Sequence, residues 1–222
     1  GNATTNPDGM SSSYEKWKSV GEFAAETAFD LIGLRDRSCD NRERNLVVLS
    51  NAGYPNVDQE STEASLDGLS EKTKASRGRN TLIEIHSAPW APLWFAFFDK
   101  ASGHCAYLEA DPSKTAKIDG GGKASPALFR LKASERIDAH YLYEHPAEYK
   151  TKFENKIFGG NEFRIVTIAN AVAEGAPACA VRAFEFHDHY CPGVTSGILM
   201  AEYLKEHFPA QKGGYFVHSV QP

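Results

Sequence analysis

The alternation of apolar and polar positions predicts helices and strands mixed along the chain. Residues 14–34 carry apolar side chains at helical spacing and end at Gly33, which predicts a helix that packs on a core. Asn45 to Ser50 is a short apolar run of residues that favour β-structure, the pattern of a buried strand. Thr81 to His86 alternates as a further strand. The charged stretch between Asp36 and Arg44 is expected to be a loop.

An aromatic hairpin is expected at the centre of a sheet. Leu93 to Phe98 and His104 to Glu109 are two apolar runs joined by a turn at Asp99 to Gly103. Helical spacing predicts further helices at 134–143, 147–156, 163–173 and 178–184. We therefore expect an α+β fold with a mixed, largely antiparallel sheet and helices packed on it. Its domain organisation is predicted as a disordered tail over residues 1–13 and a single domain over 14–222.

The densest chemistry lies near the end of the chain, at Phe186-His187-Asp188-His189-Tyr190-Cys191-Pro192-Gly193. If this segment is extended, His187, His189 and Cys191 share one side, because the period of a strand is two. Pro192 is favoured as the first residue of a helix, which we expect over Val194 to Phe208. Cys191 would then be the N-cap, where backbone amides and the helix dipole favour a thiolate.

Three interpretations of this segment remain open. Imidazole and thiolate are preferred donors for zinc and related metals, so His187, His189 and Cys191 predict a zinc, nickel or iron site. Water, substrate, a second chain or another side chain would supply a fourth ligand. Alternatively, Cys191 is a catalytic nucleophile activated by His187 or His189. The third is a cofactor-binding module, with haem as the cofactor, in which His86 and Trp90, together with Trp94, line a pocket. Histidines also cap loops, so spacing alone allows a purely structural role.

The same segment resembles the signature of the FmdE family, which takes its name from a component of formylmethanofuran dehydrogenase. That signature reads roughly His-Gly-His-x-Cys-Pro-Gly with a helix behind it, and the similarity extends over residues 184–218, including Gly197 and Met200-Ala201. The resemblance implies an α+β core and a metal or active site at His187, His189 and Cys191. Asp188 stands where glycine is usual, which suggests less freedom for a positive φ.

The composition of the chain limits the classes of partner that it is expected to bind. A net charge of −5 without a block of Lys or Arg is not the footprint of a nucleic-acid-binding protein, and no apolar run approaches the length of a membrane span. The four cysteines form no CxxC pair and are too few for iron–sulfur clusters. We expect a small-molecule or metal ligand, and a homodimer because a three-donor site leaves room for a partner chain.

The polar lead up to Ser13 is typical of an exported chain and favours a periplasmic location. The two arginines in Ser76 to Asn80 suggest either a small-anion site or a solvated loop.

Overall fold

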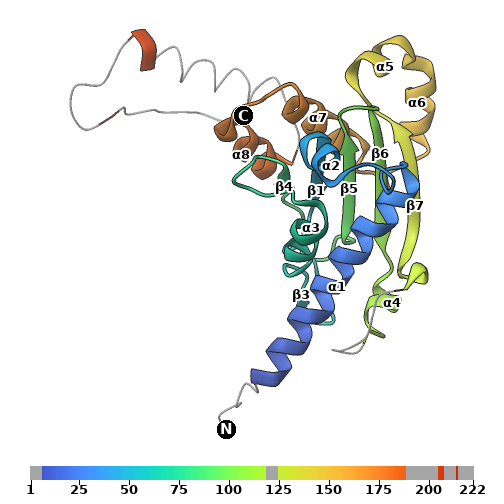
Figure 1. Ribbon diagram of the computed structural model, residues 1–222, viewed down its shortest axis with the longest axis vertical. Helices are drawn as coiled ribbons and strands as arrows, with labels where there is room; N and C mark the ends of the chain where they lie inside the picture. Colours follow the sequence, from blue (N-terminus) through green and yellow to red (C-terminus); the bar gives the residue numbers. More distant parts are fainter. Residues whose placement is uncertain (1–6, 119–124, 189–204, 208–213, 215–222) are drawn as a thin grey trace.

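The computed structural model describes residues 7–118, 125–188, 205–207 and 214. These residues form an α+β fold around a five-stranded sheet with the strand order β4-β1-β5-β6-β7 (Figure 1). Strands β1 and β4 are parallel, and every other neighbouring pair in this sheet is antiparallel. The predicted mixed, largely antiparallel sheet is thereby confirmed. The strands are β1 (Leu46–Ser50), β4 (Leu82–Glu84), β5 (Trp94–Asp99), β6 (His104–Ala110) and β7 (Phe129–Arg136), and a separate ribbon pairs β2 (Asn56–Val57) with β3 (Glu60–Ser61).

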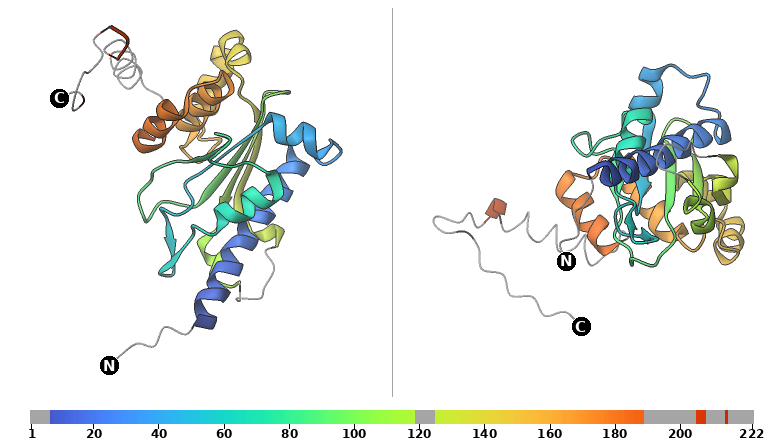
Figure 2. Two further views of the ribbon diagram at one scale, coloured as in Figure 1. Left: turned by 60° about the vertical axis from the view of Figure 1, so that its left-hand side comes forward. Right: turned by 90° about the horizontal axis from the view of Figure 1, so that it is seen from below.

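Helices cover both faces of the sheet (Figures 1 and 2). Helices α1 (Pro7–Leu31) and α3 (Ser65–Thr73) pack on one face, hereafter the α1 face, and α7 (Glu162–Ala173) and α8 (Ala178–His187) pack on the other, the α7 face. The other described helices are α2 (Cys39–Asn45), α4 (Pro112–Thr115), α5 (Ala139–Glu144), α6 (Pro146–Glu154) and the 3-10 helix η1 (Pro126–Leu128). None of the described helices is both long enough and apolar enough to cross a membrane.

The aromatic hairpin is the centre of the sheet, as the sequence predicts. Strand β5 pairs with β6 from Trp94 opposite Glu109 to Phe98 opposite Cys105, and every residue of β5 is buried. Alternate side chains of β5 enter the cores on opposite faces, because successive residues of a strand point to opposite sides. Burial on both faces explains why this segment is a continuous apolar run.

Two glycines bring α1 and α3 into backbone contact. A Cβ atom on Gly21 would lie 2.1 Å from the carbonyl oxygen of Ser65, and one on Gly68 would lie 2.1 Å from that of Lys18. The Ser65 hydroxyl donates a hydrogen bond to the Trp17 carbonyl at 2.9 Å across the same contact. No residue larger than glycine fits at either position without moving a helix.

Three segments differ from the sequence-based expectation. Helix α1 begins at Pro7, inside the segment expected to be a disordered tail. Residues 39–45 form helix α2 instead of a charged loop, and Ser38 caps this helix by accepting a hydrogen bond from the backbone N–H of Asn41. Phe129–Arg136 is the edge strand β7, which overlaps the helix expected from residue 134; helix α5 starts only after Asp138, its N-cap.

Candidate functional site

Helix α8 carries the start of the His/Cys segment. The helix continues through His187, so the condition that this segment is extended does not hold at Phe186 and His187. Asp188 then takes the left-handed conformation, with φ of 65° and ψ of 0°, and ends the helix. Aspartate is one of the few non-glycine residues that tolerate this region, so its presence in place of glycine does not prevent a positive φ. The helix therefore ends directly after His187.

Glu185 anchors α8 to the outer edge of the sheet. Its side chain is buried, and its Oε2 accepts hydrogen bonds from the backbone N–H of Glu84 at 2.6 Å and from Arg77 at 2.7 Å. Its Oε1 accepts from Arg182, and its backbone carbonyl accepts from the N–H of His86 at 3.0 Å. The backbone N–H groups of Glu84 and His86, on the side of β4 that faces away from β1, therefore both have hydrogen-bond acceptors. Helix α8 thus covers a sheet edge that would otherwise offer unpaired donors to another strand.

The arginines of the turn at 76–80 take part in this anchoring. Arg77 forms ion pairs with Glu84 and Glu185, and Arg79 pairs with Glu43. Carboxylates of the chain itself therefore already neutralise both guanidinium groups. A small anion at this turn would have to displace one of these carboxylates.

A cavity of about 220 Å³ lies where α8 ends. It is located at the carboxyl ends of the parallel strands β1 and β4, the position where open sheets commonly bind ligands. Asn51 follows β1, His86 follows β4 and Asp188 follows α8, while Asn161 and Arg164 come from the start of α7. The remaining lining residues are Ile85, Ser87, Ala88, Ala91, Pro92, Trp94 and Gly159.

The predicted aromatic pocket is only partly assembled. His86 and Trp94 line this cavity, whereas Trp90 lines a different one of about 310 Å³ together with Arg130. Trp94 belongs to the core, but 87% of the Trp90 surface is exposed. The His86 ring is exposed and has an edge-on contact with Tyr54, with ring centres 4.9 Å apart. The structure thus brings His86 to the start of the His/Cys segment and leaves Trp90 apart from it.

A guanidinium group connects the segment to the body of the domain. Arg164 pairs with the Asp188 carboxylate at 3.2 Å and donates a hydrogen bond to Oδ1 of Asn161 at 2.6 Å. The amide group of Asn161 in turn donates to the Tyr107 hydroxyl at 3.0 Å. The Asn161 side chain therefore positions Arg164, and Tyr107 of β6 in turn positions Asn161. Nothing in the sequence around Arg164 or Asn161 indicates this role.

The hydrogen bonds continue inside the α7 face. Tyr107 donates to Oε1 of the buried Glu109 at 2.8 Å, and Arg130 donates to the other carboxylate oxygen at 2.7 Å. Burial raises the pKa of Tyr107, and the nearby charge of Glu109 raises it further, so this hydroxyl remains a donor. Gly159 permits the arrangement: its φ is positive, and a Cβ there would lie 2.5 Å from Glu109 Oε1. Tyr107, Asn161 and Arg164 thus form a connected chain of hydrogen bonds that ends at the cavity.

The other predicted ligands, His189 and Cys191, lie outside the described residues, as does the helix expected over 194–208 apart from residues 205–207, which are helical. His187 is exposed at the end of α8. Within the described part of the chain, no group of three or more His, Cys, Asp or Glu side chains is arranged to hold a metal ion. Cys39 and Cys179 are exposed free thiols, and burial raises the pKa of the Cys105 thiol to about 12.

Comparison with protein-family models and with curated proteins gives no match for this chain. The resemblance to FmdE therefore depends on the His187 to Gly193 segment and the residues that follow it.

Proposed function

We propose that this protein is an FmdE-like metal-binding protein that holds one transition-metal ion through His187, His189 and Cys191. Zinc is the first choice, with nickel or iron next. The observation that carries the proposal is the seven-residue sequence from His187 to Gly193. It combines two imidazoles and a thiol at alternate positions ahead of a Pro-Gly helix start.

The surroundings of His187 support a fixed ligand at this place. His187 is exposed at the last position of a helix whose preceding turn is clamped to the sheet through Glu185. Asp188 turns the chain immediately afterwards and forms part of the cavity wall. A metal with an open coordination position would supply a Lewis acid that activates water or polarises an oxygenated substrate. The cavity beside Asp188 gives such a substrate a place to bind.

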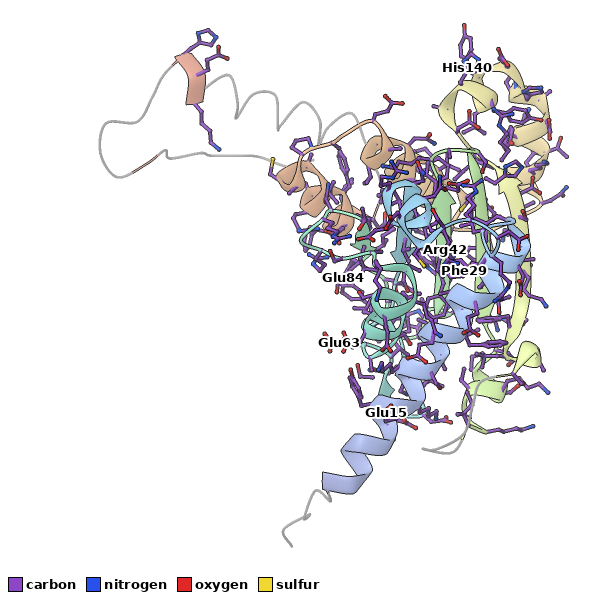
Figure 3. All side chains as sticks on the ribbon, viewed as in Figure 1. Glu15, Phe29, Arg42, Glu63, Glu84 and His140 are labelled. Atoms are coloured by element: carbon purple, nitrogen blue, oxygen red, sulfur yellow. The ribbon has the colours of Figure 1, made fainter. Side chains whose placement is uncertain are left out.

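Elemental analysis of protein purified without chelators tests the proposal. We expect close to one metal ion per chain, with His187→Ala and Cys191→Ser each losing most of it. His140→Ala and Cys179→Ser are matched controls that should retain the metal. His140 is an exposed histidine on α5, well apart from α8 (Figure 3), and Cys179 is an exposed thiol at the opposite end of α8. A metal-free chain, or equal metal content in Cys191→Ser and Cys179→Ser, would end the proposal.

Two further measurements separate the alternatives. Thiol labelling of metal-free protein across pH identifies a nucleophilic Cys191 if its pKa lies well below the ordinary value for cysteine. Cys179→Ser and Cys39→Ser remove the other exposed thiols from that signal. A visible absorption spectrum of the purified protein identifies haem, whereas a colourless protein that contains zinc agrees with the metal site.

A further inference from the structure

We infer that the cavity at the carboxyl ends of β1 and β4 binds a small carboxylate, with Arg164 as the anchoring residue. This inference deepens the proposed function by naming the ligand class beside the metal site, and only the catalytic use of the cavity rests on that function. The binding itself involves described side chains alone: Arg164, His86, Ser87 and the start of α7.

The size of the cavity limits the ligand. With about 220 Å³, the cavity has room for a ligand of a few non-hydrogen atoms. Acetate, propionate and short hydroxy acids fit within this volume. Ile85, Ala88 and Pro92 supply apolar wall for a short carbon chain, and the Ser87 hydroxyl and the His86 ring supply polar groups near it.

Arg164 is prepared for a planar anion. A guanidinium group has five N–H donors in a rigid fork that matches a carboxylate. Asn161 fixes one side of this fork and is itself fixed by Tyr107, so little side-chain freedom is lost on binding. The Asp188 carboxylate already pairs with this guanidinium at 3.2 Å, so a ligand carboxylate would take its place or use the remaining N–H groups.

Helix α7 adds to the attraction for an anion. The cavity wall includes Asn161, the N-cap of this 12-residue helix, and the Asn161 side chain makes no capping hydrogen bond to the first turn. The N-terminal end of a helix carries a partial positive charge and backbone N–H groups without a partner inside the helix, which favour an anion nearby. Arg164 and the helix end therefore act in the same direction, and the buried Glu162 carboxylate in the first turn of this helix opposes them.

Titration of metal-free protein followed by backbone amide NMR tests the inference. Acetate and propionate are added at constant ionic strength against chloride, because surface charge effects depend on salt. We expect saturable shifts at residues 86–88 and 161–164. Ethylammonium, of similar size and opposite charge, should cause none. Saturable binding of ethylammonium in place of acetate, or no saturable shift with either carboxylate, would overturn the inference.

Two substitutions with opposite expected signs make the test specific. Arg164→Gln should weaken acetate binding by about tenfold or more, because a charge-assisted bidentate contact is lost. Asp188→Asn should strengthen it several-fold, because asparagine keeps the left-handed conformation and removes the competing carboxylate. Arg35→Gln, which breaks a comparable surface pair with Asp30, is the control and should change nothing.

Unchanged acetate affinity in Arg164→Gln, or weaker affinity in Asp188→Asn, would contradict the anchoring role. If circular dichroism shows that Arg164→Gln does not fold, the acetate affinity of Asp188→Asn and the comparison with ethylammonium still test whether the cavity binds a carboxylate. Metal content is measured separately on the untreated protein. Metal without acetate binding removes this inference alone, and acetate binding without metal removes only the proposed function.

Discussion

The two faces of the sheet are built from the same strands in different ways. On the α1 face, β6 contributes Ala106 and Leu108 to an apolar core under α1 and α3. On the α7 face, the intervening residues are Tyr107 and Glu109, which begin the chain of hydrogen bonds to Arg164. Alternation along this strand thus directs apolar side chains into the α1 face and a polar pair into the α7 face. Buried polar groups are costly unless they are satisfied, and here Asn161 and Arg130 satisfy the Tyr107 hydroxyl and the Glu109 carboxylate.

The difference between the faces predicts a division of effects. Substitutions on the α1 face should change the free energy of unfolding and leave metal and acetate binding unaltered in the folded fraction. Substitutions in the polar chain of the α7 face should change both. The expected loss of stability is largest at Gly68 and decreases through Glu185 and Tyr107 to Glu84.

Gly68→Ala should destabilise the protein most, by about 3 kcal/mol, because the new methyl group meets the backbone of α1. Chemical denaturation measures the effect. Gly78→Ala is the control: no atom lies within 4 Å of a Cβ there, so the stability should stay within about 1 kcal/mol of the parent. Equal stability of the two variants would mean that α1 and α3 are not in backbone contact.

Glu185→Ala should cost about 2 kcal/mol, because charge-assisted hydrogen bonds from Arg77 and from the Glu84 amide are lost. Hydrogen exchange at the Glu84 and His86 amides should accelerate, since α8 no longer holds the β4 edge. Glu174→Ala, at an exposed glutamate after α7, should leave both amides protected. Unchanged exchange rates of the Glu84 and His86 amides in Glu185→Ala would show that Glu185 does not hold α8 against β4.

Tyr107→Phe should cost about 1 to 2 kcal/mol, because Glu109 and Asn161 each lose a buried hydrogen-bond partner. It should also weaken acetate binding, since Asn161 then holds Arg164 less firmly. Tyr143→Phe alters an exposed tyrosine and should affect neither property. If Tyr107→Phe is less stable but binds acetate as tightly as the parent, the hydrogen bonds from Tyr107 through Asn161 do not position Arg164 for binding.

Glu84→Gln should have the smallest effect and a defined pH dependence. Burial raises the pKa of Glu84, an effect that the positive charge of Arg77 reduces and the carboxylate of Glu185 adds to. The folded state therefore holds this proton more tightly than the unfolded chain, and the parent loses stability as pH rises through the raised pKa. The glutamine variant lacks this loss, so its stability relative to the parent should increase from acidic to neutral pH. Urea denaturation at both conditions measures the difference, and a change of opposite sign would contradict the assignment.

Periodicity predicts those parts of the fold in which one segment determines its own structure. The β5–β6 hairpin and helices α6, α7 and α8 follow from their apolar spacing. Strand β7 escapes prediction because its charged, one-sided alternation depends on pairing with β6. Helix α2 is not predicted from periodicity, because its short charged sequence has no apolar face.

The candidate site is predictable only where its residues are neighbours in the sequence. The His187 to Gly193 segment shows itself by composition, whereas Arg77 meets Glu185 across 108 positions and Asn161 meets Tyr107 across 54. Such contacts arise from the packing of α7 and α8 on the sheet and leave no local pattern. The end of α8 illustrates the same limit, because alternation of His187 and His189 suggests a strand where packing on β4 favours a helix.

An X-ray absorption spectrum at the edge of the bound metal tests the central claim most directly. For zinc, a site formed by His187, His189 and Cys191 predicts one sulfur ligand at about 2.3 Å and nitrogen ligands at about 2.0 to 2.1 Å, with the sulfur contribution absent in Cys191→Ser. A spectrum with only oxygen ligands, or one that is unchanged in Cys191→Ser, would contradict it.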